Sequence, residues 1–299
     1  MYVVLGASGH IGSVVARKLL AQAQPIRVLG RNAANLQSLA AQGAEISVAN
    51  LSDTSALTQA FQGALSAFVM VPPNPTSNNI LADQSRVIDS IVTAIKNAGL
   101  KNIVALNSIG SDKPSGTGLI LSTHEFEQKL KQIENVNLLI LRLGSFMENT
   151  LQQIGAIKHM GAILGMVPAD LKVPMIATRD IGDYAATALL KLQVHGKQTR
   201  ELHVQRDLDN QEAAAIIGQA IGKPDLKYVQ APPAQFKAAM VQMGLSENFA
   251  DLYLEMSEAL NSGHMRMLEP RDEGNTTPTS FETFVCDTFL PAYQCRQAA

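Results

Sequence analysis

Residues 2–12 read Tyr-Val-Val-Leu-Gly-Ala-Ser-Gly-His-Ile-Gly, a short apolar run followed at once by three glycines that are spaced three apart. The apolar run predicts a buried β-strand, and residues 11–22 predict an amphipathic helix directly after it. In such a strand–turn–helix, Gly6 permits the tight turn and Gly9 lets the backbone approach a ligand closely. Gly12 lets the helix pack on the sheet. The stretch therefore predicts a βα unit with a phosphate-binding loop at the N-terminus of its helix.

This loop predicts a dinucleotide cofactor, because the free N–H groups and partial positive charge of a helix N-terminus suit a pyrophosphate. We expect contacts from every residue of the loop: Gly6, Ala7, Ser8, Gly9, His10, Ile11 and Gly12. An ordinary βα turn without a ligand is the competing interpretation, and it is disfavoured because strand and helix both stand in the register that binding requires.

The end of the second predicted strand indicates which dinucleotide is bound. An NAD-specific site usually has an acidic residue here to hold the ribose 2′-hydroxyl. This chain instead has Gly30 followed by Arg31, whose planar guanidinium suits a 2′-phosphate. We therefore predict a nicotinamide dinucleotide, with NADP(H) preferred over NAD(H). An arginine that merely faces solvent is the alternative.

Two more strand ends supply candidate cofactor contacts. Asn50 and Leu51 follow the third predicted strand, where folds of this kind commonly contact adenine. Val71 and Pro72 lie where the fourth predicted strand stops. Ligands bind outside the carboxyl ends of the strands in open α/β sheets, so both stretches are predicted to contact the cofactor. Plain loops would look the same.

The first half of the chain alternates apolar, β-branched runs with amphipathic stretches. The predicted strands are 2–5, 26–29, 45–48, 67–71, 102–106 and 137–141. The predicted helices are 11–22, 33–42, 54–62, 80–99 and 123–134. Strands that are apolar on both faces and alternate with helices indicate an α/β fold, a Rossmann-type doubly wound parallel sheet with right-handed crossovers.

The pattern changes after residue 145. We predict a Gly-rich loop at 161–165, strands at 173–176, 201–204 and 227–229, a helix at 179–192, and a mainly helical remainder. The predicted domains are an NAD(P)-binding Rossmann domain over 1–150 and a smaller substrate region over 151–299, with short segments of 173–205 returning to the sheet. Five methionines of the last part predict core filling, or alternatively an adaptable lid over a substrate: Met240, Met243, Met256, Met265 and Met267.

The composition excludes several classes of protein. Of the 299 residues, 46% are hydrophobic and 17% charged, which suits a packed core and argues against wholesale disorder. A net charge of -2 gives no basic stripe for direct nucleic-acid binding, and no apolar run approaches the ~20 residues of a membrane span. Two cysteines, Cys286 and Cys295, and the lack of metal-ligand spacing favour a reduced cytoplasmic protein without a metal site.

Several motifs, in order along the chain, resemble the NmrA-like branch of atypical short-chain dehydrogenases/reductases. They are the GxxGxxG loop, Gly30-Arg31-Asn32, residues 141–149 (Leu-Arg-Leu-Gly-Ser-Phe-Met-Glu-Asn), Asp180-Ile181-Gly182 with Ala185-Ala186, and residues 275–284 (Asn-Thr-Thr-Pro-Thr-Ser-Phe-Glu-Thr-Phe). The resemblance covers most of the chain, although Leu143 stands where the family often has proline. It implies cofactor binding more firmly than chemistry, because some members are NADPH-dependent reductases of quinones or plant phenolic compounds and others are dinucleotide sensors.

The catalytic pair typical of short-chain dehydrogenases, Tyr-x-x-x-Lys, is absent, because none of the five tyrosines has a lysine four residues later. On the helix predicted at 123–134, Lys129 stands where the family lysine stands, Glu125 replaces the tyrosine, and His124 precedes it. This arrangement resembles the His-x-x-x-x-Lys of NmrA-like quinone reductases. Lys129, His124 and Ser108 are therefore candidate catalytic residues, and Lys129 is also a candidate cofactor contact. A solvated Glu125–Lys129 pair and an ordinary loop serine are the alternatives.

We predict an NAD(P)H-dependent oxidoreductase that reduces a quinone or conjugated carbonyl compound. Such a reaction needs a held nicotinamide and one group that donates a proton or stabilises an oxyanion, and His124 or Lys129 would serve. The alternative is a non-catalytic NAD(P) sensor that acts through a protein partner. A sugar-nucleotide epimerase ranks last, because it normally keeps the tyrosine. The expected partner is a small molecule, with no nucleic acid or membrane, and a homodimer or a regulatory protein stays open.

Overall fold

A parallel sheet of seven strands forms the centre of the molecule in a computed structural model that describes residues 1–295. The strand order is β10-β6-β5-β4-β1-β2-β3, and every neighbouring pair is parallel. The strands are β1 (Tyr2–Val4), β2 (Ile26–Gly30), β3 (Glu45–Val48), β4 (Ser66–Val69), β5 (Asn102–Ser108), β6 (Asn137–Leu143) and β10 (Lys197–Leu202). The order reverses between β1 and β4, which makes the carboxyl ends of these two strands the expected ligand crevice.

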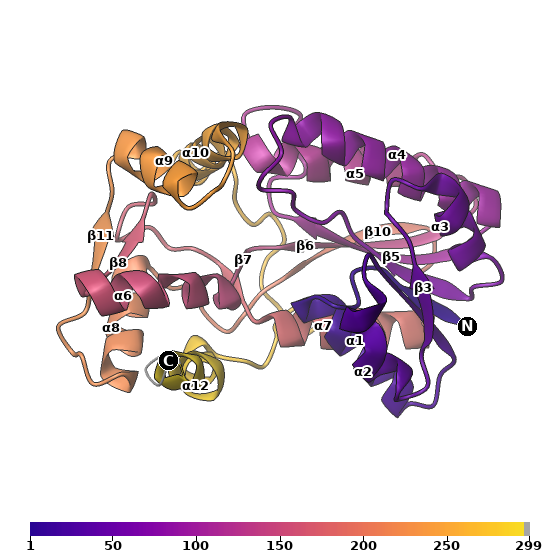
Figure 1. Cartoon of the computed structure of the whole chain (residues 1–299), viewed down its shortest axis with the longest axis horizontal. Coiled ribbons are helices and arrows are strands. Elements are labelled where there is room, and N and C mark those ends of the chain that lie inside the picture. The colour runs from indigo at the N-terminus through magenta and orange to yellow at the C-terminus, as the bar shows by residue number, and fades with distance from the viewer. Residues whose placement is uncertain (296–299) are drawn as a thin grey trace.

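Helices cover both faces of this sheet, as Figure 1 shows. On one face lie α1 (His10–Ala21), α2 (Gln37–Ala40) and α7 (Thr178–Lys191), and on the other α3 (Thr54–Phe61), α4 (Ile80–Ala98) and α5 (Leu121–Lys131). The central strands β1 and β4 are buried along their whole length, because each of their faces packs against one helical layer. The predicted fold class is confirmed.

The predicted elements of the first half agree with the structure within a few residues, with two differences. Residues 33–42 are not one helix but a 3₁₀ turn, η1 (Ala33–Leu36), followed by the four residues of α2. The fourth strand ends at Val69, so Val71 lies outside the sheet. Pro72 and Pro73 follow, and proline cannot extend the hydrogen-bonded ladder.

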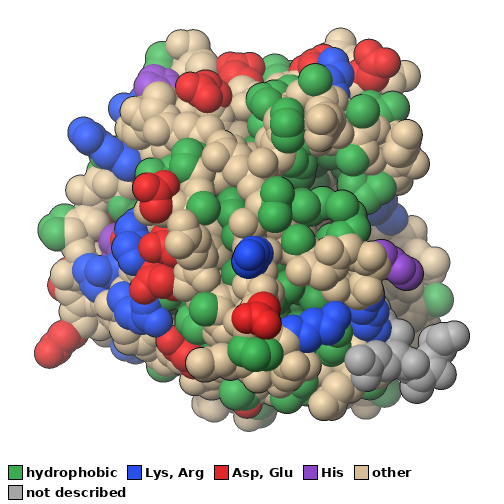
Figure 2. All heavy atoms as spheres, turned by 90° about the vertical axis from the view of Figure 1, so that its left-hand side faces the viewer, with side chains coloured by type: hydrophobic (Ala, Val, Ile, Leu, Met, Phe, Trp, Pro, Cys, Tyr) green, Lys and Arg blue, Asp and Glu red, His purple; other side chains and the backbone are tan. Residues whose placement is uncertain are grey.

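The second half adds a smaller part beside the sheet, at the end opposite β3 in Figure 1. Its strands form two parallel pairs, β7 (Ser145–Phe146) with β9 (Met175–Ile176), and β8 (Ala162–Gly165) with β11 (Lys227–Gln230). Its helices are η3 (Met147–Gln153), α6 (Ile154–Met160), α8 (Asn210–Ala220), α9 (Pro233–Gln242), α10 (Glu247–Asn261), α11 (Phe281–Phe284), η4 (Val285–Phe289) and α12 (Leu290–Cys295). Hydrophobic and charged side chains mingle on the face of this part that Figure 2 shows. Met160 and Met243 are largely exposed.

Three predictions for the second half are wrong in detail. Residues 161–165 are not a loop: Gly161 ends α6 in a left-handed conformation, and the next four residues form β8. The strand expected at 201–204 begins at Lys197 and ends at Leu202, because it pairs in register with Leu138–Leu143 of β6. Of the strand expected at 173–176, only the last two residues form a strand, which is β9. The pairing partners that decide these limits lie far away in the sequence.

No helix within residues 1–295 combines the length and the apolar composition that a membrane crossing would need.

Gly182 brings α1 and α7 into close contact on one face of the sheet. A Cβ on Gly182 of α7 would lie 2.6 Å from Cβ of Val14 and 3.0 Å from the carbonyl oxygen of Ile11, both in α1. Ile11 and Ile181 are buried next to this contact. The Asp180-Ile181-Gly182 motif thus owes its glycine to helix packing.

Replacing this glycine tests the contact. Gly182→Ala is expected to destabilise the chain by about 1–3 kcal/mol, because the added methyl group overpacks the α1–α7 contact. Urea unfolding measures the effect. Gly155→Ala is the matched control, since nothing lies within 4 Å of its added Cβ. The control is expected to be neutral or slightly stabilising, and an equal loss in both variants would refute the packing role of Gly182.

Candidate functional site

The glycine loop between β1 and α1 is tightly wound. Gly6 has φ +65, and its carbonyl oxygen accepts a hydrogen bond from the N–H of Gly9 at 2.9 Å. A Cβ on Gly12 would collide with that same carbonyl oxygen. Positive φ and close backbone approach are the two conditions that demand glycine. The tight turn predicted for Gly6 is confirmed, whereas Gly12 lets the helix approach the backbone of the loop at Gly6 and Ala7 rather than a strand of the sheet.

The N-terminus of α1 is open to an anionic ligand. Its N-cap residue, Gly9, gives no side-chain hydrogen bond to the helix, and no acidic residue stands in the first turn. Ser8, Gly9 and His10 are exposed, whereas Ala7 and Ile11 are buried and hold the loop on the core. Uncapped N–H groups and a positive helix end are what a pyrophosphate requires.

Arg31 follows β2 directly and is exposed. Among the ion pairs of residues 1–295, none involves its guanidinium. The next residue, Asn32, accepts a hydrogen bond from the N–H of Ala34 at 2.9 Å and so fixes the chain at this strand end. The positive charge of Arg31 is therefore uncompensated beside the β1–β2 end of the sheet.

The remaining predicted cofactor contacts are also at carboxyl ends of strands. The side chain of Asn50, after β3, accepts a hydrogen bond from the N–H of Ser52 at 3.2 Å and so shapes its own turn. Leu51 is half-buried. Val71 and Pro72, after β4, are half-buried too, and the carbonyl oxygen of Pro72 accepts from Nε2 of Gln84 at 3.3 Å. The strand order places these residues along the edge that carries the glycine loop.

Lys129 belongs to α5, and its side chain reaches α4. Its ammonium is 2.6 Å from Oδ1 of Asp89 and 2.6 Å from Oε1 of Glu125, and 30% of its side chain is exposed. Burial by itself would lower the pKa of Lys129, but the hydrogen bonds to these two carboxylates outweigh burial and raise it. The Glu125–Lys129 pair that the sequence offered as the alternative is present, and Ser85 donates to the same Glu125 oxygen at 2.6 Å.

The other two candidate catalytic residues are anchored to different groups. Nδ1 of His124 is 2.8 Å from the carbonyl oxygen of Ser111, in the loop between β5 and α5. The hydroxyl of Ser108 donates to the carbonyl oxygen of Leu143 at 3.5 Å, the outer limit of a hydrogen bond. No hydrogen bond within residues 1–295 joins Ser108, His124 and Lys129 to one another.

A buried ion pair beneath this helix was missed by sequence reasoning. Glu127 of α5 is fully buried, and Arg142 of β6 donates to it from Nε at 3.0 Å and from Nη2 at 2.6 Å. Lys131 donates to the same carboxylate at 2.6 Å, and Asn107 at 3.0 Å. Burial by itself would raise the pKa of Glu127, but the hydrogen bonds from Arg142 and Lys131 outweigh burial and lower it. An arginine inside the apolar run of β6 was the signal, since a buried charge needs a partner.

The C-terminal helices are tied to the loops that follow β4 and β5. Ser246, the N-cap of α10, donates its N–H to the carbonyl oxygen of Pro75 at 3.0 Å and its hydroxyl to that of Ser77 at 2.5 Å. The N–H of Ile80 donates to Asn248 at 2.9 Å.

Met265 packs on Ile109 in a small apolar cluster that also includes Met256 and Met267. Met240 and Met265 are buried, which fits core filling, whereas Met243 is 72% exposed.

Three motifs from distant parts of the chain hold one another. Glu148 accepts hydrogen bonds from the N–H and hydroxyl of Thr178 at 3.0 and 2.6 Å and so caps α7. Asp180, in the first turn of α7, accepts from the N–H and hydroxyl of Thr279 at 2.8 and 2.7 Å. These carboxylates stabilise the junction of the two halves, a role that the order of the motifs did not reveal.

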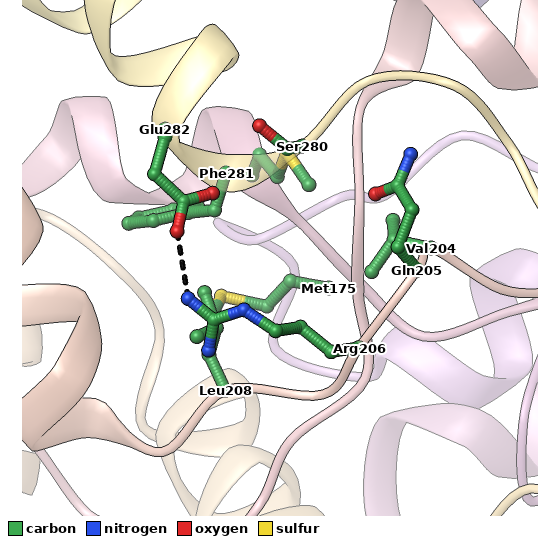
Figure 3. Close-up of a pocket in the computed structure, with 9 residues that line it drawn as sticks. Met175, Val204, Gln205, Arg206, Leu208, Ser280, Phe281 and Glu282 are labelled. Carbon is green, nitrogen blue, oxygen red and sulfur yellow. Dashed lines mark hydrogen bonds and ion pairs between the residues drawn. The ribbon is translucent and has the colours of Figure 1, made fainter.

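A cavity of about 110 Å³ lies at this junction. Apolar side chains form most of its wall, and Arg206 meets Glu282 at 2.6 Å across it, as Figure 3 shows. None of the predicted site residues lines the cavity. Its lining residues are Met147, Met175, Val204, Gln205, Arg206, Leu208, Ser280, Phe281 and Glu282.

The glycine loop and the interlocked motifs lie within a region that one family model matches. A model of the NmrA-like family matches residues 2–284. The chain belongs to the NmrA-like family. The resemblance that its motifs predicted is confirmed, and the matched residues of this NmrA-like chain include both the glycine loop and the motif around Thr279.

Relatives of the NmrA-like chain include named reductases. It is 32% identical over 258 residues to the NAD(P)H azoreductase of Xenophilus azovorans, a match that covers 86% of each chain. It is 28% identical over 269 residues to quinone oxidoreductase 2 of Escherichia coli K12, covering 88% of this chain and 89% of that one. The crystal structure of an NADPH-dependent quinone oxidoreductase from Escherichia coli, complexed with NADPH, matches with a TM-score of 0.79 and 26% identity. That match covers 97% of this chain and 100% of the other.

The buried Glu127 makes the free energy of unfolding depend on pH in the acid range. Because its pKa is lower in the folded chain than the ordinary value of 4.5, the stabilisation is complete above that value and is lost as pH falls through the folded value. Glu127→Gln is expected to lower the free energy of unfolding near pH 7 by roughly 3 kcal/mol and to flatten its fall below about pH 4.5. Urea titrations at neutral pH and at a series of pH values below 4.5 measure both effects. The exposed Glu134→Gln is the control, and an unchanged acid slope in Glu127→Gln would contradict the pair's role.

Proposed function

We propose that this chain is an NAD(P)H-dependent oxidoreductase that uses NADPH in preference to NADH and reduces a quinone or conjugated carbonyl compound. The observation that carries the proposal is the uncapped N-terminus of α1 behind the glycine loop, with the exposed guanidinium of Arg31 at the next strand end. The azoreductase and quinone oxidoreductase names of its relatives support a reductase.

The residues present fit such a cofactor. The loop from Gly6 to Gly12 is wound so tightly that a Cβ at position 12 would collide with the carbonyl oxygen of Gly6, and it leads into the uncapped N-terminus of α1. It would hold the pyrophosphate, and Arg31 would pair with a 2′-phosphate. Further contacts are proposed along the same edge from Asn50 and Leu51, and from Val71 and Pro72. When bound, a reduced nicotinamide supplies a hydride.

The two halves of the chain would have different roles in binding. We infer that residues 1–150 hold the cofactor and that residues 151–299 form the substrate region. Ser246 donates a hydrogen bond to Pro75 in the loop after β4, and Asn248 accepts one from the N–H of Ile80 at the start of α4. Met265 packs on Ile109 after β5. These contacts support this division, because they place C-terminal segments beside strand ends at which a substrate would meet the nicotinamide.

The candidate catalytic residues fit reduction better than alcohol oxidation. Without Tyr-x-x-x-Lys, the chain lacks the usual base for a hydroxyl group. A quinone needs a well-positioned hydride donor and one proton donor or positive group. We propose His124 for the proton, with Ser108 as a second group near the strand end. Lys129 is the third candidate, but two carboxylates already compensate its charge.

Calorimetric titration with the four nicotinamide dinucleotides tests the cofactor. We expect NADPH to bind most tightly. Arg31→Asp is expected to weaken NADPH binding by roughly 10- to 100-fold, with little change for NADH, because a charge-assisted contact to the 2′-phosphate is lost. Arg266→Asp, at another exposed arginine, makes the same charge change and should leave binding unaltered. Equal weakening by both variants would remove Arg31 from the site.

Consumption of NADPH tests turnover. We expect the wild-type chain to oxidise NADPH with simple quinones and conjugated enones, with an azo dye as a parallel acceptor. If NADPH binds tightly and no acceptor of this panel is reduced, the reductase proposal fails and a dinucleotide sensor is left. Discrimination between NADP+ and NADPH without turnover would point to the same conclusion.

Lys129→Met separates a catalytic lysine from a structural one. Since Asp89 and Glu125 already compensate its charge, we expect the turnover rate to fall less than about threefold and stability to change by less than about 1 kcal/mol. Lys96→Met, at an exposed lysine of α4, is the control. If turnover instead slows by roughly 100-fold or more while NADPH binding stays intact, Lys129 belongs to the reaction.

A further inference from the structure

The imidazole of His124 is held in one tautomer. Its Nδ1 lies 2.8 Å from the carbonyl oxygen of Ser111, and a carbonyl oxygen accepts but never donates. Nδ1 therefore carries the proton, and Nε2 of the neutral ring presents a lone pair. Nε2 makes no hydrogen bond within residues 1–295 and is not among their buried unpaired atoms. This nitrogen is consequently accessible.

The carbonyl that sets the tautomer is itself fixed by a buried network. Ser111 is fully buried, its hydroxyl donates to Oδ1 of Asn107 at 3.0 Å, and it lies 2.7 Å from the hydroxyl of Thr123. Nδ2 of Asn107 donates to Glu127 at 3.0 Å and to the carbonyl oxygen of Thr123 at 3.2 Å. Because both ends of the Asn107 amide are engaged, its orientation is determined.

This network of hydrogen bonds begins at the carboxylate of Glu127 and ends at the imidazole of His124. Glu127 is anchored by Arg142, Asn107 by Glu127, Ser111 by Asn107, and His124 by Ser111. Buried networks in which each member is satisfied specify a single arrangement. The loop after β5 is thereby locked to the first turns of α5, at the carboxyl edge of the sheet.

Two other histidines show that the tautomer is particular to this position. Nε2 of His203 is 2.9 Å from the carbonyl oxygen of Glu269, and Nε2 of His264 is 3.0 Å from that of Ser115. Both rings therefore carry the proton on Nε2 when neutral. Among these three carbonyl-bonded histidines, His124 alone leaves Nε2 free.

We propose that Asn107 and Ser111 are positioning residues that hold His124 as the Nδ1–H tautomer, so that its Nε2 exchanges the proton with the substrate. This inference rests on the proposed reductase function. The oxyanion that forms when the substrate accepts a hydride takes the proton from Nε2–H of the imidazolium and becomes a hydroxyl. The neutral ring then regains a proton from water at the same nitrogen. Nδ1–H of His124 stays hydrogen-bonded to the carbonyl oxygen of Ser111 throughout.

The charges around the ring are compensated by partners of their own. In the loop beside Ser111, Lys113 meets Asp112 at 2.9 Å, and Asp112 lies 4.0 Å from Arg142. On α5, Glu125 and Glu127 are paired with Lys129 and Arg142. The hydrogen bond to Ser111, rather than a neighbouring carboxylate, is thus the contact that orients the ring.

Long-range ¹H–¹⁵N NMR of histidine-labelled protein tests the tautomer without any turnover. We expect the neutral ring of His124 to be protonated on Nδ1, and those of His203 and His264 on Nε2, so the spectrum contains its own references. Ser111→Ala should convert His124 to a mixture of both tautomers. Ser115→Ala removes a hydroxyl from an exposed loop residue and should leave His124 unchanged. Protonation of wild-type His124 on Nε2 would overturn the proposal.

Kinetics test whether the held nitrogen takes part in the reaction. Ser111→Ala is expected to slow turnover by roughly 10-fold and His124→Gln by roughly 100-fold, with NADPH affinity changed less than about twofold. Ser115→Ala should match wild type. A mixed tautomer in Ser111→Ala with an unchanged turnover rate would overturn the proton role. Tight NADPH binding and the expected tautomer in a wild-type chain that reduces no acceptor would overturn the proposed function, and with it the proton transfer, while the positioning of His124 would stand.

Discussion

The close approach of the α1 backbone to the carbonyl oxygen of Gly6 is the constraint on which the rest of the structure depends. No side chain fits between Gly6 and Gly12, so the first helix starts directly above the first strand and points its uncapped end at the sheet edge. Gly182 then lets α7 lie against α1, which closes one face of the sheet. The open N-terminus of α1 follows from the first of these contacts, and the packing of α7 on α1 follows from the second.

A second constraint lies on the other side of the sheet, where charge is buried. Arg142 follows the apolar run 138–141 of β6, and its buried charge is compensated chiefly by the fully buried Glu127. Such a pair contributes little net stability but penalises every arrangement that separates its members. Here it also orients Asn107, through which the loop after β5 is fixed. Rigidity of the proposed reaction site is therefore a consequence of an interaction below its surface.

The groups proposed for cofactor binding and those proposed for the reaction differ in kind. The glycine loop proposed to bind the cofactor is made of backbone, so its geometry is strict and its residues are recognisable. The groups proposed for the reaction are side chains whose partners decide what they do. Lys129, which matches the family position, is held by Asp89 and Glu125, whereas His124 keeps one nitrogen free.

The sequence by itself determined the parallel sheet, its six N-terminal strands and the glycine loop, because these follow from local periodicity and from steric needs that glycine alone satisfies. It also indicated Arg31, since a strand end is a local feature. Only the tertiary structure decided the limits of β8 and β10, which depend on partners far along the chain. Likewise, it alone showed that Glu148 and Asp180 hold other motifs and that Asn107 and Ser111 orient His124. Hydrogen bonds between residues distant in sequence leave no periodic trace, so spacing along the chain cannot reveal them.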